Sequence, residues 1–195
     1  MFISRAAMLF LALFFTGCSA LPKSPLAPEK ADPLSASNVG IDGAPCVGGV
    51  IDSTPGLVEA KNPQLLERAR MPTDKGGVCA AKVFSISSPI RLYRVFDSGN
   101  PHSKFGSWWT LRQPDGTRED YRAENAICNE WSKLDRVVSC EVRPGSQIVI
   151  GTTQSAACSD GSIYPKSATN QVFVPNDGRA GIIHVGACSE SAVWP

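Results

Sequence analysis

"RVVSCEVRPGSQIVIGTT", residues 136–153, places two runs of β-branched and aliphatic residues on either side of the turn signal Arg-Pro-Gly. Runs of this composition, bounded by proline and glycine, are typical of β-strands. Similar runs occur upstream and downstream, in AAKVFSI (80–86), IRLYRVF (90–96), SWWTLR (107–112), NQVFVP (170–175) and GIIHVGAC (181–188). The sequence therefore predicts a domain built mainly from strands.

Two short segments carry helix signals instead. Asn62 followed by Pro63 is typical of an N-cap and first helical residue, and predicts a helix over PQLLERAR. Thr117 and Asp120 have the spacing of a capping box at the start of REDYRAENAI, which is rich in helix-forming residues. We therefore expect an α+β fold: a mostly antiparallel β domain with one or two short helices, held together by disulfides.

The N-terminus carries an export signal. Arg5 precedes an uncharged apolar run over residues 6–15, which is shorter than the roughly 20 residues of a membrane span and is typical of a signal peptide. The run ends in a Thr-Gly-Cys sequence that resembles the bacterial lipobox, which implies residues 1–17 as a lipoprotein signal peptide and lipidation (palmitate) at Cys18. Ser19 after the cysteine implies a cell-envelope lipoprotein of the outer membrane, facing the periplasm or the surface. Cleavage beside Ser19 without a lipid is the alternative.

Composition changes along the chain. Residues 19–45 contain five prolines and no aromatic residue, and the first aromatic residue after the signal is Phe84. From Phe84 to the C-terminus, Phe84 included, the chain contains four tryptophans, three tyrosines and four phenylalanines. We therefore expect a lipidated Pro-rich tether over 18–45, an N-terminal flap over 46–77 and a globular α+β domain over 78–195.

The chain has seven cysteines. Assigning Cys18 to lipid leaves an even number, which in an exported chain predicts a disulfide framework. The six are Cys46, Cys79, Cys128, Cys140, Cys158 and Cys188. Closing the shortest loops costs the least chain entropy and favours the pairs 46–79, 128–140 and 158–188. No metal site is expected, because no C-x-x-C pair occurs and the chain has only two histidines.

Charge argues against one class of partner. Without Arg5, the 19 lysines and arginines fall to 18, which equals the 18 aspartates and glutamates. Neutralising phosphates along a nucleic acid requires a basic excess, so nucleic acid is not expected as a partner. The expected partners are the membrane, through the N-terminal lipid, and either NAD or a protein.

Trp108 and Trp109 are adjacent within a predicted strand. Side chains of consecutive strand residues point to opposite faces, so one tryptophan enters the core and the other faces outward. The outward ring is either a stacking platform for a planar ligand or packs beneath the N-terminal flap or a neighbouring loop. The sequence leaves both interpretations open.

A resemblance to a known family covers about residues 90–175. The order of LYRVFDSG, KFGSWWT, YRAENAICNEW, VRPGSQIVIGTTQSA and NQVFVP resembles the toxin domain named for tuberculosis necrotizing toxin. That family is an NAD glycohydrolase related in fold to ADP-ribosyltransferases. Because the acidic catalytic residue of the transferases has no counterpart here, the resemblance implies a secreted or envelope-anchored hydrolase that cleaves the nicotinamide–ribose bond.

The resemblance also implies roles for individual residues. It makes Gln171 and Arg122 catalytic. It assigns substrate binding to Arg94, Lys104, Phe105, Trp108 and Trp109. It implies that NAD is the substrate and that no cofactor is needed. It also implies one cleft, which is lined by SWWTLR and QVFV and has Lys104 at its rim. Lys104 and Gln171 are both expected to be exposed. The competing hypothesis is a non-enzymatic, disulfide-bonded outer-membrane lipoprotein that acts as an interaction, inhibitor or immunity module.

Overall fold

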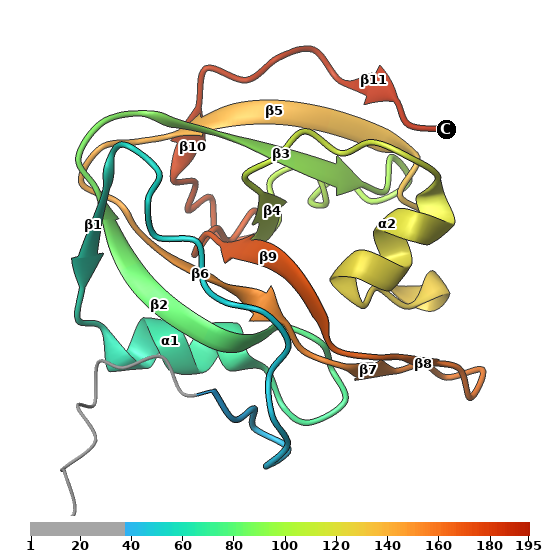
Figure 1. Ribbon diagram of the computed structural model, residues 1–195. Coiled ribbons are helices and arrows are strands. Elements are labelled where there is room, and N and C mark those ends of the chain that lie inside the picture. The colour runs from blue at the N-terminus through green and yellow to red at the C-terminus, as the bar shows by residue number, and fades with distance from the viewer. Residues whose placement is uncertain (1–37) are drawn as a thin grey trace, which may run out of the picture. The chain divides into compact units, whose positions relative to one another are not determined.

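The computed structural model of the protein describes residues 38–195 (Figure 1). The expected signal peptide, Cys18 and most of the expected tether lie outside these residues. The described chain forms the strands β1 (Leu57–Ala60), β2 (Val78–Ile86), β3 (Ile90–Phe96), β4 (Trp108–Thr110), β5 (Arg136–Val142), β6 (Gln147–Thr153), β7 (Ala156–Ala157), β8 (Ile163–Tyr164), β9 (Ser167–Phe173), β10 (Val185–Gly186) and β11 (Ala192–Val193). Its helices are α1 (Pro63–Arg70), α2 (Arg118–Asn125) and the short 3₁₀ helix η1 (Asn129–Trp131). None of the helices between residues 38 and 195 is long and apolar enough to cross a membrane.

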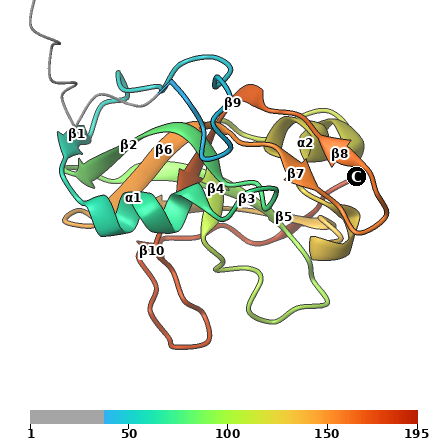
Figure 2. The same cartoon turned by 90° about the horizontal axis from the view of Figure 1, so that it is seen from below.

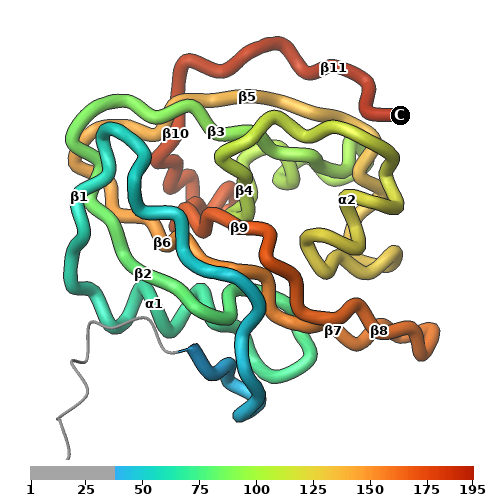
Figure 3. Tube along the Cα trace, in the orientation of Figure 1, coloured from blue at the N-terminus to red at the C-terminus, as the bar shows by residue number. Residues whose placement is uncertain are grey.

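The sheet confirms the expected fold class. Its strand order is β1-β2-β6-β9-β4-β3-β5-β10, with β11 also on β5, and every pairing is antiparallel. The sheet curls into a half-barrel (Figures 1 and 3). The hairpin of β7 and β8 forms a separate two-stranded sheet. The curl follows from the twist that antiparallel strands accumulate across a wide sheet.

The alternation of side chains along the strands produces two cores. Even-numbered residues of the central strands, such as Phe84, Ile150 and Val172, point into the concave side and form the main core. Odd-numbered residues of the same strands, such as Val149 and Phe173, point to the other face and pack with α1. Because both faces are covered, these strands read as continuous apolar runs rather than strict alternation.

Both helices begin where the sequence predicts. The side chain of Asn62 accepts a hydrogen bond from the backbone N–H of Leu65 at the start of α1. At α2, Thr117 and Asp120 form both hydrogen bonds of a capping box. These caps satisfy backbone N–H groups that have no partner inside the helix.

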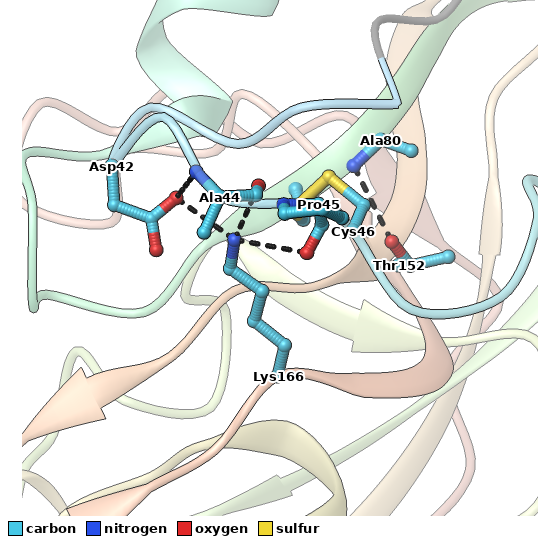
Figure 4. A network of polar contacts seen from close by, with 8 residues as sticks. Asp42, Ala44, Pro45, Cys46, Ala80, Thr152 and Lys166 are labelled. Carbon is cyan, nitrogen blue, oxygen red and sulfur yellow. Dashed lines mark hydrogen bonds and ion pairs between the residues drawn. A yellow bond between two sulfur atoms is a disulfide. The ribbon is translucent and has the colours of Figure 1, made fainter.

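The N-terminal part of the described chain is attached to the domain. Lys166 Nζ donates to Asp42 Oδ1 at 2.8 Å and to the carbonyls of Ala44 and Pro45 at 2.7 and 3.2 Å (Figure 4). The pKa of Asp42 is lowered, and the hydrogen bond from Lys166 is the largest cause. Residues 38–45, which the sequence places in the tether, therefore pack against the domain.

The expected flap is integral to the domain. β1 pairs with β2 from Leu57 to Ala60, and α1 buries Leu65 and Ala69 in the second core. The segment lacks aromatic residues, which predicts a separate flap, but aliphatic side chains are sufficient to fill the space beneath the sheet.

All six expected cysteines are paired, but two of the three expected pairs are wrong. The disulfides join Cys46 to Cys79, Cys128 to Cys158 and Cys140 to Cys188. Only the first was predicted. Sheet pairing overrides loop length: β10 lies against β5, which brings Cys188 beside Cys140. Cys128 then pairs with Cys158, which stands next to the β7–β8 hairpin.

Several predicted strand limits also differ. GIIHVGAC forms only the two residues of β10, and SWWTLR forms only the three of β4. β1, β7, β8 and β11 were not predicted. These are short strands, with two to four residues each, and their pairing depends on neighbours distant in sequence rather than on local composition.

Candidate functional site

A cleft of about 290 Å³ opens over the three adjacent strands β9, β4 and β3. These strands contribute Gln171, Trp108 and Arg94 to its lining. One wall is the α1–β2 connection, and the other runs from the end of α2 through η1. The complete lining is Met71, Lys75, Gly76, Gly77, Arg94, Val95, Trp108, Asn125, Ala126, Ile127, Trp131, Ser132, Leu134 and Gln171. The structure thus brings together three of the residues singled out from the sequence.

Gln171 is buried, with 5% of its surface exposed, which corrects the expectation that it is exposed. Its Nε2 donates to the carbonyl of Asn125 and to Thr153 Oγ1, both at 3.0 Å. Its Oε1 accepts no hydrogen bond from residues 38–195. The side-chain nitrogen therefore fixes the amide between β9 and α2, and the oxygen is the atom left for a ligand or a water molecule.

Arg94 occupies the gap between β3 and β4. These strands pair at a single position, Tyr93 with Thr110. Arg94 Nη1 donates to the carbonyl of Trp108, and Nε donates to the carbonyl of Ser103 at 2.7 Å. The guanidinium thus replaces backbone hydrogen bonds that the splayed strands do not make. Burial lowers the pKa of Arg94 to about 10, so the side chain keeps its positive charge at neutral pH.

Gly106 makes room for this guanidinium. A Cβ atom built on Gly106 would lie 2.3 Å from Arg94 Nη2 and 2.7 Å from Arg94 Cζ. Any side chain at this position would displace the guanidinium from the carbonyls that it binds. The glycine after Phe105 is therefore required by a close approach at the edge of the cleft.

The tryptophan pair divides between the two faces of the sheet, as predicted. Trp109 is 1% exposed in the main core, and its Nε1 donates to the carbonyl of Gly106 at 2.8 Å. Trp108 is on the other face, packed edge-on against Phe173 with 5.1 Å between ring centroids, and it also lines the cleft. Trp109 therefore does not line the cleft. Trp108 thus packs on Phe173 and also borders the cleft, so the role of a stacking platform stays a prediction.

Three other residues assigned to the site do not line the cleft. Arg122 is buried, and its Nη atoms donate to the carbonyls of Ile127, Cys128 and Ser132. Its guanidinium thus holds the wall of the cleft in place. Lys104 and Phe105 lie in the β3–β4 connection, where Lys104 Nζ is 5.5 Å from the Phe105 ring centre and Phe105 packs on the main core. Lys104 is thus not among the residues that line the cleft, and its expected position at the rim stays a prediction.

The cleft residues that were not predicted include a cation and a tryptophan. Lys75 comes from the α1–β2 connection, and Trp131, which is 42% exposed, comes from η1. Lys75 precedes a Gly-Gly pair in which both glycines have positive φ, and a Gly-Gly pair is a loop signal that is visible in the sequence. Trp131 ends the YRAENAICNEW segment quoted for the resemblance, but no role was given to it.

The charge of the cleft has one sign. Its lining contains two cations, Lys75 and Arg94, and no carboxylate. It also contains two tryptophans and two amide side chains, those of Asn125 and Gln171. A flat aromatic ligand with negative charge has matching chemistry, because rings stack on tryptophan and anions pair with the cations.

One cluster of the described residues has the spacing of metal ligands, formed by Cys128, Glu130 and Cys158. Its two sulfur atoms are joined in a disulfide, so neither is a thiolate ligand. Glu130 instead accepts a hydrogen bond from the backbone N–H of Ser159 at 2.8 Å. This cluster is a structural crosslink.

Comparison with known proteins gives little further guidance. No family model and no curated protein matches the chain. One chain of a solved structure of Tne2 in complex with Tni2 is similar to it, with a TM-score of 0.42 and 14% sequence identity. The similarity covers 63% of this protein and 96% of that chain. Likeness at this level carries no information on function, which has to be inferred from the cleft itself.

Proposed function

We propose that the cleft binds NAD and that the protein is an NAD glycohydrolase that cleaves the nicotinamide–ribose bond. The observation that carries this proposal is the convergence of Gln171, Trp108 and Arg94, from three neighbouring strands, on one cleft without a carboxylate. Lys75 and Trp131 complete the set from the opposite walls. Cations and aromatic faces together orient a dinucleotide, which neither kind of residue does alone.

The size of the cleft limits the mode of binding. Ligand pockets usually enclose roughly 300–1,000 Å³, and this one has about 290 Å³. A cleft of this size holds the nicotinamide riboside half of the dinucleotide. In the proposed complex the nicotinamide ring stacks on Trp108 or Trp131, and the pyrophosphate crosses the rim near Lys75.

The reaction requires a cation-like transition state. As the glycosidic bond breaks, its electron pair moves to the ring nitrogen, positive charge develops on the ribose, and the nicotinamide leaves neutral. Water then adds to the ribose carbon and releases a proton to the solvent. The Gln171 Oε1 atom is a fixed acceptor for a ribose hydroxyl or for this water, because Nε2 is already bound on both sides.

The test is release of nicotinamide from NAD by the full-length, oxidised protein. Because Gln171 is buried, Gln171→Ala also removes structural hydrogen bonds, so Trp131→Ala is the second variant. We expect Gln171→Ala to reduce kcat and Trp131→Ala to raise KM. The matched control is Gln113→Ala, an exposed glutamine outside the cleft, which should retain full activity. An inactive wild type at high protein concentration would overturn the proposal.

A specific observation favours a second candidate, a non-enzymatic interaction or inhibitor module. Arg94 and the nitrogen of Gln171 are already occupied by backbone carbonyls and a threonine hydroxyl, and Lys104 is absent from the cleft. Groups fixed in this way preserve a rigid binding face. NAD that binds in calorimetry without nicotinamide release, or no NAD binding at all, would favour this candidate.

We also propose that the protein is exported and anchored in the cell envelope through a lipid on Cys18. The three disulfides support export, because such crosslinks form and persist in oxidising compartments. Anchoring in the outer membrane would suit a toxin displayed on the cell surface as well as an immunity module. Mass spectrometry of the mature protein should find a lipidated N-terminal cysteine, and an unmodified start at residue 20 or later would contradict the proposal.

A further inference from the structure

A second hollow, of about 820 Å³, lies apart from the cleft and shares no lining residue with it. It is bordered by α1, by the β5–β6 turn, and by the connection from β9 to β10, which extends from the body of the domain as a loop (Figure 2). The hollow is broad and open, and we call it the basic basin after the three residues Arg68, Arg143 and His184 in its lining.

The three side chains come from three different elements. Arg68 is on α1, Arg143 is in the β5–β6 turn, and His184 precedes β10. The guanidinium of Arg68 lies 5.6 Å from the centre of the Phe173 ring. Arg143 Nη1 donates to the carbonyl of Ile183 at 3.1 Å. These contacts orient both guanidinium groups without neutralising them.

The lining of the basin contains two arginines and one carboxylate. Among residues 38–195, neither Arg68 nor Arg143 forms an ion pair. The one carboxylate that lines the basin belongs to Asp177, and its Oδ1 accepts hydrogen bonds from the backbone N–H groups of Arg179 and Ala180. Burial first, and then the charges of Arg143 and Arg68, lower the pKa of His184. Arg143 and Arg68 thus lie close enough to His184 to disfavour its protonated form.

We propose that the basic basin binds the phosphate group of a ligand, with Arg68, Arg143 and His184 as its partners. A phosphate presents oxygen atoms in several directions, so it meets donors from three elements at once. Arg143 keeps Nε and Nη2 for this contact, since only Nη1 is engaged in the described chain. Binding an anion relieves the repulsion among the cations and favours protonation of His184.

The basin leaves room for more than the phosphate. Because it is open to solvent and much larger than the cleft, the rest of the ligand extends away from the cations. Two kinds of ligand carry such a phosphate group: a free phosphate monoester, and a lipid whose headgroup is a phosphodiester. This inference does not depend on NAD cleavage, because the two sites have no residue in common.

His184 reports on binding directly. The chain has two histidines, so the imidazole signals of the full-length, oxidised protein are assigned by NMR with the single variant His102→Asn. Inorganic phosphate and dihexanoyl phosphatidylglycerol below its micelle concentration are the two probes. We expect a probe that binds to raise the pKa of His184 by about one pH unit, as an opposite charge at close range does, while the His102 signal does not move.

Three variants show whether the response belongs to the basin. Arg143→Ala and Arg68→Ala should each lower the affinity of the protein for the probe about tenfold, which is equivalent to the loss of one charge-assisted contact. Arg112→Ala is the matched control, because Arg112 is an exposed arginine outside the basin and the change in net charge is the same. Its affinity for the probe should equal that of the wild type.

The outcomes separate the two ligand sources. A response to inorganic phosphate alone assigns a free phosphate or monoester, and a response to the lipid alone assigns a headgroup; each supports the site. The proposal is overturned when neither probe moves the His184 titration. It is also overturned when Arg112→Ala weakens binding as much as Arg143→Ala does, because the effect is then only that of net charge.

Discussion

At the scale of single residues, the edge of the cleft depends on one half-buried arginine and one glycine. Arg94 binds the carbonyls of Ser103 and Trp108 in the gap between two strands, and Gly106 provides the space. The resemblance assigned Arg94 to the substrate phosphate. The Nε and Nη1 donors are directed at the β3–β4 connection and at the backbone of β4, so this part of the guanidinium positions the edge of the cleft.

Gly106→Ala should therefore destabilise the protein. The new Cβ would overlap the guanidinium of Arg94, and we expect a loss of about 1–3 kcal/mol in the free energy of unfolding, typical of overpacking a tight site. Denaturant titration measures this loss. Gly49→Ala is the control, because a Cβ there meets no atom within 4 Å. Equal stability of the two variants would show that Arg94 adapts at no cost.

His184 gives the protein a pH dependence of known sign. Its pKa is lowered in the folded state from the ordinary value of 6.5, so the unfolded chain binds the proton more readily. The stability that depends on neutral His184 is therefore present above pH 6.5 and is lost as the pH falls below it. Unfolding of the wild type and of His184→Gln at about pH 7.5 and about pH 5.5 checks this. The variant should lose less stability on acidification, and parallel losses would contradict the assignment.

At the scale of elements, local signals in the sequence define the helices better than they define the short strands. The cap of α2 needs only residues three apart, Thr117 and Asp120, so it is visible in the sequence. β4 is three residues long and pairs with β9 over its full length, but with β3 at one position. Its existence depends on a partner 17 residues away in β3 and on partners more than 60 residues away in β9, which composition does not encode.

Thr117→Ala should weaken α2 and with it the wall of the cleft. Loss of an N-cap side chain typically lowers the free energy of unfolding by about 1 kcal/mol. The matched control is Thr73→Ala, an exposed threonine outside the helices. Chemical denaturation should show the loss only for Thr117→Ala, and hydrogen exchange should be faster in α2. Unchanged exchange in α2 would mean that tertiary contacts alone hold this helix.

At the scale of the whole molecule, the three disulfides fasten different parts of the sheet. Cys46–Cys79 ties down the N-terminal segment, and Cys140–Cys188 ties the C-terminal segment to β5. Cys128–Cys158 joins the segment that carries Trp131 to the β7–β8 hairpin. This last crosslink acts next to the wall of the cleft that runs from α2 through η1.

Removing either of two disulfides should therefore lower the stability of the protein, but only one of the two removals should also lower its affinity for a ligand. By the loop-entropy relation, replacing either the 128–158 or the 140–188 pair with serines should cost about 3–4 kcal/mol. Only the 128–158 variant should also weaken ligand binding in the cleft, because Trp131 and Ser132 lose their support. Calorimetry with NAD on both folded variants measures this difference. Equal affinity in the two variants would show that Arg122 suffices to hold the wall.

The sequence by itself determined the fold class, both helix starts, the opposite directions of Trp108 and Trp109, and the pairing of all six cysteines in the domain. Each of these follows from local rules: cap spacing, the two-residue period of a strand, and cysteine number. Only the tertiary structure decided which cysteines meet, that Gln171 is buried, and that Lys75 and Trp131 join the cleft while Lys104 does not. These depend on strand order, because residues distant in sequence become neighbours only when the sheet has paired and curled.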